Sequence, residues 1–330
     1  MKKTDTYIAV RCNGIFAQYI EEYVGLKRTF GFKYNLETTV LNNFDAFCVR
    51  QNLHSTKIIS SFLSAWESKL YNENETSHKL RVRVVRGFLS YLSKKGICVP
   101  NNFHPLPNAK AGFVPYIFSR NEIANFINAV DKMSHEKVAI SPIRHLVMPV
   151  LFRMIYGCGL REAEATHLKK KDIAFEDRTV RIINSKGDYD RIVVMSESLT
   201  NICYNYYIRD EIKTFESEYF FPSPDHTYYS NSSIYDIFRK ALFIAGIYHK
   251  GRGKGPRLHD LRHTYAVHVL SKWQKEGKDL YVCLPILSDY LGHKNITSTE
   301  RYVQLVPESY IEVTDAYDTM YDNIFPEVEV

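Results

Sequence analysis

Several features that mark other protein classes are missing from this chain of 330 residues. It contains no run of about 18 uncharged apolar residues, and its N-terminus lacks the apolar core of a secretory signal. The six cysteines include no C-x-x-C pair, which argues against a zinc ribbon or a small disulfide scaffold. No phosphate-binding loop, internal repeat or low-complexity segment is present. We therefore expect a cytoplasmic protein with reduced thiols and no membrane partner.

Charge is distributed unevenly along the chain, although the net charge is only +6. Residues 1–110 hold 16 Lys and Arg against 8 Asp and Glu, and residues 111–302 hold 27 against 22. Residues 303–330 hold no basic residue and 7 acidic ones. This asymmetry favours phosphate contacts in the first two parts and protein contacts in the last.

Apolar spacing and proline content predict two domains. Residues 1–98 carry apolar residues at helical spacing in about four segments, which predicts a small helical domain. Residues 99–117 contain four prolines, which is typical of an extended linker. We expect a catalytic domain over residues 118–306 and an acidic tail helix over residues 307–330.

The expected second domain is helical with a small antiparallel sheet. Ser119 and Glu122 form a capping-box pattern that predicts a helix to about Val130, and a further helix follows from Pro142 to about Tyr156. Two β-rich runs, 179–184 and 191–195, flank a polar segment and predict a hairpin. The fold class is therefore mainly α with a small antiparallel β-sheet (α+β).

The fourth helix of the first domain, expected between Ser77 and Lys95, presents a basic stripe. An ordinary solvated face would explain such a stripe on a packed helix. Contact with phosphates is the alternative interpretation, and the motifs of the second domain favour it. The residues of this stripe are Lys79, Arg83, Arg86 and Lys94.

Four separated pieces of the second domain, in chain order, together resemble the catalytic signature of the tyrosine recombinase (integrase) family. They are Gly159-Leu-Arg161-Glu-Ala-Glu164, the hairpin Lys186, His259-Asp-Leu-Arg262-His-Thr-Tyr-Ala, and Leu291-Gly-His293 with Tyr302 nine residues later. Each piece alone is weak evidence, whereas the whole series at this spacing seldom arises by chance. The resemblance covers residues 119–305, and Glu162 departs from it where the family usually has an apolar residue.

The chemistry of phosphodiester exchange explains why these residue types belong together. Exchange requires an in-line nucleophile, an acid for the leaving oxygen and positive charge near the phosphate oxygens. Arg161 and Arg262 can supply that charge through planar guanidinium groups. The resemblance implies that Tyr302 is the nucleophile, that it forms a 3′-phosphotyrosine, and that neither metal nor ATP is needed.

The remaining site residues follow from the resemblance, each beside a plainer alternative. It makes Lys186 the general acid, although an exposed turn lysine is the alternative. It makes His259 and His293 donors to the phosphate, and either could accept the Tyr302 proton. Glu164 matches the acidic position that supports the arginine. His263 and His268, on the same helix as His259, are expected to be structural.

Two of these segments also allow other interpretations. His259 and His263 share a helical face, as zinc ligands do, but the required Glu is replaced by Asp260 and no third ligand is obvious. The segment 250–255 is interpreted as a flexible basic loop that contacts DNA through Arg252 and Lys254. No metal or cofactor is expected.

The expected function is site-specific DNA recombination, on double-stranded DNA and by a homotetramer holding two duplexes, with accessory recombination proteins as possible partners. An inactive DNA-binding regulator of the same fold and a monomeric type IB topoisomerase are the alternatives. A helix-spaced apolar stripe in the acidic tail predicts docking on a neighbouring protomer or on its own domain; it consists of Tyr310, Val313, Tyr317, Met320 and Ile324.

Overall fold

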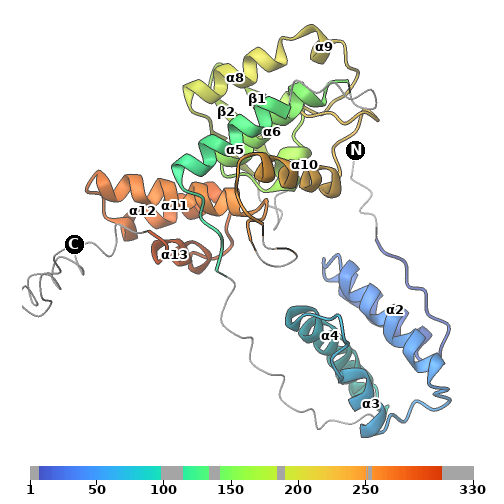
Figure 1. The fold of residues 1–330 in the computed structure, drawn as a ribbon. Coiled ribbons are helices and arrows are strands. Elements are labelled where there is room, and N and C mark those ends of the chain that lie inside the picture. The colour runs from blue at the N-terminus through green and yellow to red at the C-terminus, as the bar shows by residue number, and fades with distance from the viewer. Residues whose placement is uncertain are drawn as a thin grey trace, which may run out of the picture. The chain divides into compact units, whose positions relative to one another are not determined.

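The computed structural model describes residues 7–97, 114–133, 142–183, 190–249, 251 and 255–306 (Figure 1). The chain divides into two compact units, residues 1–113 and 114–330. Among the described residues, no helix combines the length and apolar character needed to cross a membrane. The mainly helical fold with a small antiparallel sheet, predicted above, is confirmed.

The first unit contains α1 (Ala17–Thr29), α2 (Asn35–Arg50), α3 (Ser60–Glu67) and α4 (Glu75–Lys94). Fully buried aromatic rings form its core: Phe16 stacks on Phe44 at 6.3 Å and meets Phe88 edge-on at 6.1 Å between centroids. Burial of each such ring contributes about 1.5–3 kcal/mol. The fourth helix begins two residues before the predicted Ser77, because the Asn74 side chain caps it by accepting a hydrogen bond from the Ser77 amide at 2.8 Å.

The second unit opens with α5 (Arg120–Met133) and α6 (Arg144–Gly157). The predicted capping box is confirmed: the Glu122 carboxylate accepts from the Ser119 amide at 2.8 Å, and the Ser119 hydroxyl accepts from the Glu122 amide at 3.2 Å. The second helix begins at Arg144 rather than at the predicted Pro142. Phe126 of α5 packs against Phe152 of α6 at 5.3 Å, which joins the two helices in the main core.

A three-stranded antiparallel sheet follows, in the order β1-β2-β3. It comprises β1 (Ile173–Ala174), β2 (Thr179–Ile182) and β3 (Arg191–Val194). The predicted hairpin strands are confirmed, although each ends earlier than expected and β1 was not predicted. Thr179 pairs with Val194 and Ile182 with Arg191, so Arg191 belongs to the strand pair next to the segment that connects β2 and β3.

Helices make up most of the rest of this unit. They are α7 (Glu162–Thr166), the 3-10 turn η1 (Lys170–Asp172), α8 (Glu197–Tyr207), α9 (Asp210–Lys213), α10 (Asn231–Ile244), α11 (Asp260–Lys275), α12 (Leu280–Leu291) and α13 (Thr297–Val303). The helices α11, α12 and α13 lie together (Figure 1) and share a second apolar cluster. Leu270, Leu284 and Leu291 are buried in this cluster beside Tyr302. The predicted nucleophile therefore belongs to a packed three-helix layer.

Candidate active site

The hydroxyl of Tyr302 lies against a histidine of the neighbouring helix. Tyr302, on α13, is only 4% exposed, and its Oη is 2.7 Å from Nδ1 of His263 on α11. Burial raises the pKa of Tyr302 above its ordinary value, although Arg262, Arg301 and Arg161 oppose the rise. The nucleophile proposed from the sequence is thus neutral and hydrogen-bonded, in a field of positive charge.

His263, which the sequence predicted to be structural, contacts the Tyr302 hydroxyl. One helical turn separates His263 from His259, and the two rings meet edge-on with centroids 4.6 Å apart. His259 itself is exposed at the start of α11. His268 hydrogen-bonds through Nδ1 to the Tyr156 hydroxyl at 2.9 Å, which agrees with a structural part.

Arg161 and Arg191 share one buried carboxylate, that of Glu164. Arg161 Nη1 donates to Glu164 Oε1 at 2.6 Å, and the two Nη atoms of Arg191 donate to both carboxylate oxygens at 2.8 and 2.7 Å. Burial by itself raises the pKa of Glu164, but the hydrogen bonds and charges of Arg191 and Arg161 outweigh it and lower the pKa to about 2. Glu164 is therefore ionised at neutral pH and fixes both guanidinium groups.

Arg262 is the largest fully buried side chain in the described part of the chain, 1% exposed. Its Nη1 donates to the Gly159 carbonyl at 2.7 Å, its Nη2 donates to the Leu291 carbonyl, and Glu164 Oε2 lies 3.8 Å away. Burial lowers its pKa to about 10, so the group keeps its charge at neutral pH. These two bonds use two of the five N–H groups of a guanidinium.

Two glycines make the turns that receive these arginines. Gly159 has φ +59°, and a Cβ there would lie 2.5 Å from the Tyr265 ring. Gly292 ends α12 with φ +66°, and its carbonyl accepts from Arg161 Nη2 at 2.8 Å. A side chain at either position would be strained, so glycine lets the backbone present its carbonyls to Arg161 and Arg262.

His293 follows directly on Gly292 and faces Tyr302. Its Nδ1 is hydrogen-bonded to the Thr299 hydroxyl at 2.8 Å, and its ring centroid is 6.1 Å from that of Tyr302. Burial, together with Arg262 and Arg161, lowers the pKa of His293 to about 4. Burial, together with Arg257 and Arg262, lowers the pKa of His263 to about 4 as well.

These two histidines predict a pH dependence of stability. We expect the free energy of unfolding of the DNA-free protein to fall as pH decreases from about 6.5 to about 4, because the unfolded chain then binds protons that the folded sites exclude. The effect is at most about 1.4 kcal/mol per pKa unit for each ring, and partial exposure reduces it.

Urea unfolding at a series of pH values measures this dependence. His263→Gln should flatten the slope in that window, whereas the contribution of Glu164 is lost only below its unfolded pKa of about 4.5. A wild-type stability that stays constant between about pH 6.5 and pH 4.5 contradicts the prediction.

Three predicted contact residues and the tail lie outside the described residues: Lys186, Arg252, Lys254 and the segment 307–330. Over the described part of the chain, no three His, Cys, Asp or Glu side chains are grouped so that they could hold a metal ion.

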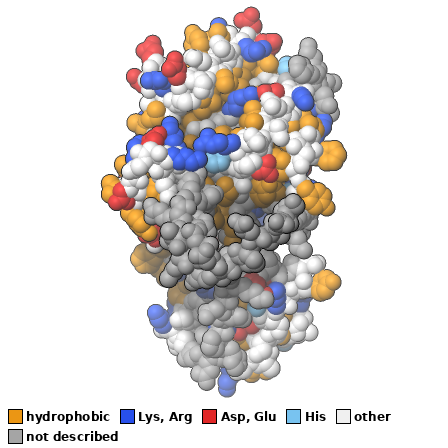
Figure 2. Space-filling model, turned by 60° about the vertical axis from the view of Figure 1, so that its left-hand side comes forward, with side chains coloured by type: hydrophobic (Ala, Val, Ile, Leu, Met, Phe, Trp, Pro, Cys, Tyr) orange, Lys and Arg blue, Asp and Glu red, His pale blue; other side chains and the backbone are white. Residues whose placement is uncertain are grey.

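Figure 2 shows Lys and Arg side chains gathered around a histidine on one face of the molecule.

The basic stripe on α4 is not uniform. Both Nε and Nη2 of Arg86 donate to the Glu67 carboxylate at 2.7 Å, and only 16% of the Arg86 side chain is exposed. The prediction that Arg86 faces DNA phosphate is therefore corrected, since this cation is already paired inside the unit. Arg83 and Lys94 are exposed and Lys79 is half-buried.

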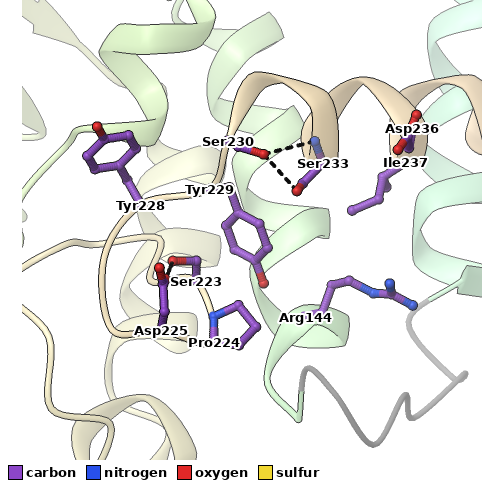
Figure 3. Close-up of a pocket in the computed structure, with 10 residues that line it drawn as sticks. All are labelled: Arg144, Ser223, Pro224, Asp225, Tyr228, Tyr229, Ser230, Ser233, Asp236 and Ile237. Carbon is purple, nitrogen blue, oxygen red and sulfur yellow. Dashed lines mark hydrogen bonds between the residues drawn. The ribbon is translucent and has the colours of Figure 1, made fainter.

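A cavity of about 480 Å³ lies at the start of α10 (Figure 3) and contains none of the predicted catalytic residues. Arg144 faces it, but so do the carboxylates of Asp225 and Asp236. Within it, the Ser230 hydroxyl accepts from the Ser233 amide at 3.2 Å as the helix cap. This mixture of charges disfavours a phosphate site, so the cavity is not part of the candidate active site.

The sequence motifs did not predict two contacts of the candidate site, that of Arg191 with Glu164 and that of His263 with Tyr302. Arg191 gave no local signal, because it is one of several basic residues near the hairpin and its partner Glu164 is 27 residues away. His263 did give a signal, since its spacing from His259 places both rings on one face of α11. From the sequence that spacing is compatible with a structural histidine or with a metal ligand.

The second unit matches a known protein family. Residues 117–308 match the phage integrase family. A tyrosine recombinase of Pseudothermotoga lettingae is 29% identical over 257 residues, covering 78% of each chain.

Solved structures of low sequence identity share the fold. XerH recombinase bound to a palindromic difH substrate has a TM-score of 0.61 at 19% identity, covering 86% of this chain and 79% of that one. A lambda integrase tetramer bound to a Holliday junction has a TM-score of 0.59 at 15% identity, covering 88% and 78%. Because the family match spans more than half of the chain, this protein belongs to the phage integrase family of tyrosine recombinases.

Proposed function

We propose that this protein is an active site-specific recombinase that cuts and rejoins DNA through a 3′-phosphotyrosine at Tyr302. The observation that carries the proposal is the convergence on residues 291–293. Arg262 and Arg161 bond to the carbonyls of Leu291 and Gly292, and His293 follows beside the Tyr302 ring. Two cations and a nucleophile thus meet where a single phosphodiester could bind.

Each side chain has a part in the proposed reaction. Arg161 and Arg262 stabilise the negative charge that develops on the phosphate oxygens, and His259 and His293 donate hydrogen bonds to the same group. Glu164 holds Arg161 in place, and Arg191 belongs to the same supporting network. Tyr302 attacks the phosphorus in line and displaces the 5′-oxygen.

Lys186 is proposed as the acid that protonates the departing 5′-oxygen. It lies outside the described residues, between β2 and β3, and the support for its part is its place in the hairpin sequence. The bond to Tyr302 retains the energy of the broken phosphodiester. The reaction therefore needs neither ATP nor a metal ion.

The proposed substrate is double-stranded DNA, and the proposed assembly is a homotetramer. Exchange between two duplexes cuts four strands, and each cut consumes one tyrosine nucleophile. The solved relatives include a recombinase bound to its DNA substrate and a tetramer bound to a Holliday junction, which supports both proposals. We place the protein with its DNA in the cytoplasm and keep the tail over residues 307–330 as an inter-protomer segment. Accessory proteins remain a further proposal.

The first unit is proposed to bind the DNA backbone through an exposed basic face. Three cations, Arg83, Lys27 and Lys33, and one carboxylate, Glu37, line a hollow of about 360 Å³, so positive charge is in excess there. Cations of this kind attract phosphates without reading sequence.

Charge reversal tests this face. Lys79→Glu and Arg83→Glu should weaken binding to all DNA sequences alike. The slope of the logarithm of the binding constant against the logarithm of salt concentration should fall by about one for each phosphate that the variant no longer neutralises. Arg86→Glu should instead lower the unfolding temperature of the unit, because it sets two carboxylates against each other at Glu67. Fluorescence anisotropy at several salt concentrations and thermal unfolding measure the two effects. If the DNA affinity of the wild type does not change with salt concentration, the basic face does not bind phosphates.

Covalent trapping tests the proposed function. A nicked suicide substrate loses its 5′-hydroxyl fragment after cleavage, so a phosphotyrosine adduct accumulates and survives denaturation. Mass spectrometry of the digested adduct should find the DNA on the peptide that contains Tyr302. If the protein is an inactive regulator, no adduct forms. If it is a monomeric topoisomerase, an adduct forms without assembly on two duplexes.

A further inference from the structure

A proton acceptor for the nucleophile is the missing part of the proposed reaction. Tyr302 must lose its hydroxyl proton to attack phosphorus, and its pKa is raised by burial, so free phenolate is scarce at neutral pH. The group in hydrogen-bond contact with that hydroxyl is Nδ1 of His263, at 2.7 Å. A general base must lie within such a distance of the proton it removes.

The other basic groups nearby contact groups other than the Tyr302 hydroxyl. His293 Nδ1 is bonded to the Thr299 hydroxyl at 2.8 Å, and the ring of His259 packs edge-on against His263. The buried Asp260 carboxylate accepts from the Arg257 amide at 2.8 Å and from its guanidinium at 2.9 Å. The geometry therefore favours His263 over the histidines named in the catalytic signature.

We propose that His263 is a catalytic residue that accepts the Tyr302 proton during cleavage and returns it during rejoining. In cleavage the Oη–H bond breaks, the proton passes to Nδ1, and the oxygen forms the new bond to phosphorus. The 5′-oxygen leaves with its electron pair and takes a proton from the general acid. Rejoining reverses each transfer. This inference rests on the proposed function.

The surroundings of His263 couple this base to the substrate. Cations face it from several elements: Arg257 before α11, Arg262 on α11, His293 after α12 when protonated, and Arg301 on α13. They disfavour the imidazolium, so the ring is neutral and able to accept a proton at neutral pH. Asp260, the nearby acid, is held by Arg257. A bound phosphate adds negative charge and so raises the proton affinity of the ring where DNA is present.

The test is the rate of adduct formation in a single turnover on the suicide substrate, measured between about pH 6 and pH 9. The variant is His263→Gln, because Gln retains a hydrogen bond to Tyr302 but cannot take its proton. His268→Gln is the matched control, since His268 lies on the same helix and also bonds to a tyrosine hydroxyl, at 2.9 Å. Each variant is also made with 3,5-difluorotyrosine at position 302, whose phenol is more acidic.

If His263 is the base, the slower cleavage of its variant can be reversed by making the tyrosine more acidic. His263→Gln should slow cleavage by about 10²-fold near neutral pH. The deficit should shrink as pH rises, and difluorotyrosine should restore most of the rate to this variant while changing the wild type little. His268→Gln should cleave at the wild-type rate.

Other results overturn the inference. A deficit of His263→Gln that is constant with pH and unaffected by difluorotyrosine assigns His263 a purely structural part. A pH-reversible deficit in His259→Gln with none in His263→Gln assigns the base to His259. If the wild type forms no adduct at any pH, the proposed function itself fails, and this inference fails with it.

Discussion

Replacing Tyr302 with phenylalanine abolishes the covalent capture of DNA and leaves DNA affinity nearly unchanged. The substitution removes only the nucleophilic oxygen, and the ring keeps its place in the apolar cluster of α11, α12 and α13. His263 loses its partner at 2.7 Å, so we expect a loss of about 1 kcal/mol in the free energy of unfolding. End-labelled suicide substrate on a denaturing gel measures the capture, and anisotropy measures the affinity.

Tyr290 offers the matched control for this result. Its hydroxyl donates to the Val194 carbonyl at 3.1 Å, and burial raises its pKa well above the ordinary value. A backbone carbonyl cannot take the proton of Tyr290 as an imidazole can take that of Tyr302, so Tyr290→Phe should still form the adduct. A denaturant-stable adduct in Tyr302→Phe places the nucleophile elsewhere and removes the basis of the proposed function.

Arg161→Ala and Arg262→Ala each slow cleavage by at least about 10²-fold, the scale of a lost donor at a developing negative charge. Lysine should not substitute at either position, because its ammonium lacks the planar fork that bonds two acceptors at once. The measurement is the single-turnover rate at saturating protein, which separates cleavage from binding.

The two arginines should differ in their effect on stability. Arg262→Ala leaves the buried carbonyls of Gly159 and Leu291 without their donor, which costs about 1–3 kcal/mol for each unpaired group. Arg161 is half-buried, and its partner Glu164 still has the ion pair with Arg191. The Arg161→Ala protein should therefore have a higher free energy of unfolding than the Arg262→Ala protein.

A paired arginine outside the site separates these effects from general loss of charge. Arg153 of α6 bonds the Asp131 carboxylate at 2.6 Å, and Arg153→Ala should leave the cleavage rate unchanged. If Arg161→Ala cleaves at the wild-type rate while folded, the arginine cluster has no catalytic part and the proposed mechanism is wrong.

Local patterns in the sequence were sufficient for the fold class, for the first two helices of the second unit and for the hairpin of β2 and β3. The capping box at Ser119 and Glu122 depends on residues three positions apart, so it could be recognised directly. The same holds for the hairpin, whose strands alternate within a few residues of each other. Boundaries were less secure, because capping by a residue such as Asn74 depends on which side chain reaches the first free amide.

Charge pairing across elements could not be foreseen from one helix. The stripe on α4 grouped Arg86 with Arg83, yet Arg86 bonds Glu67 on another helix whereas Arg83 is exposed. A helical face fixes only the direction of a side chain; the partner comes from whatever packs beside it.

The sequence by itself determined the residue types of the candidate site and their order: two arginines, two histidines and a tyrosine whose chemistry suits phosphate. Only the tertiary structure decided how they are paired. It brought Arg191 to Glu164 from 27 residues away, and it set His263, 39 residues from Tyr302, against that hydroxyl. Side-chain hydrogen bonds act over about 3 Å, and contacts between residues so far apart in the chain depend on how the helices and strands pack.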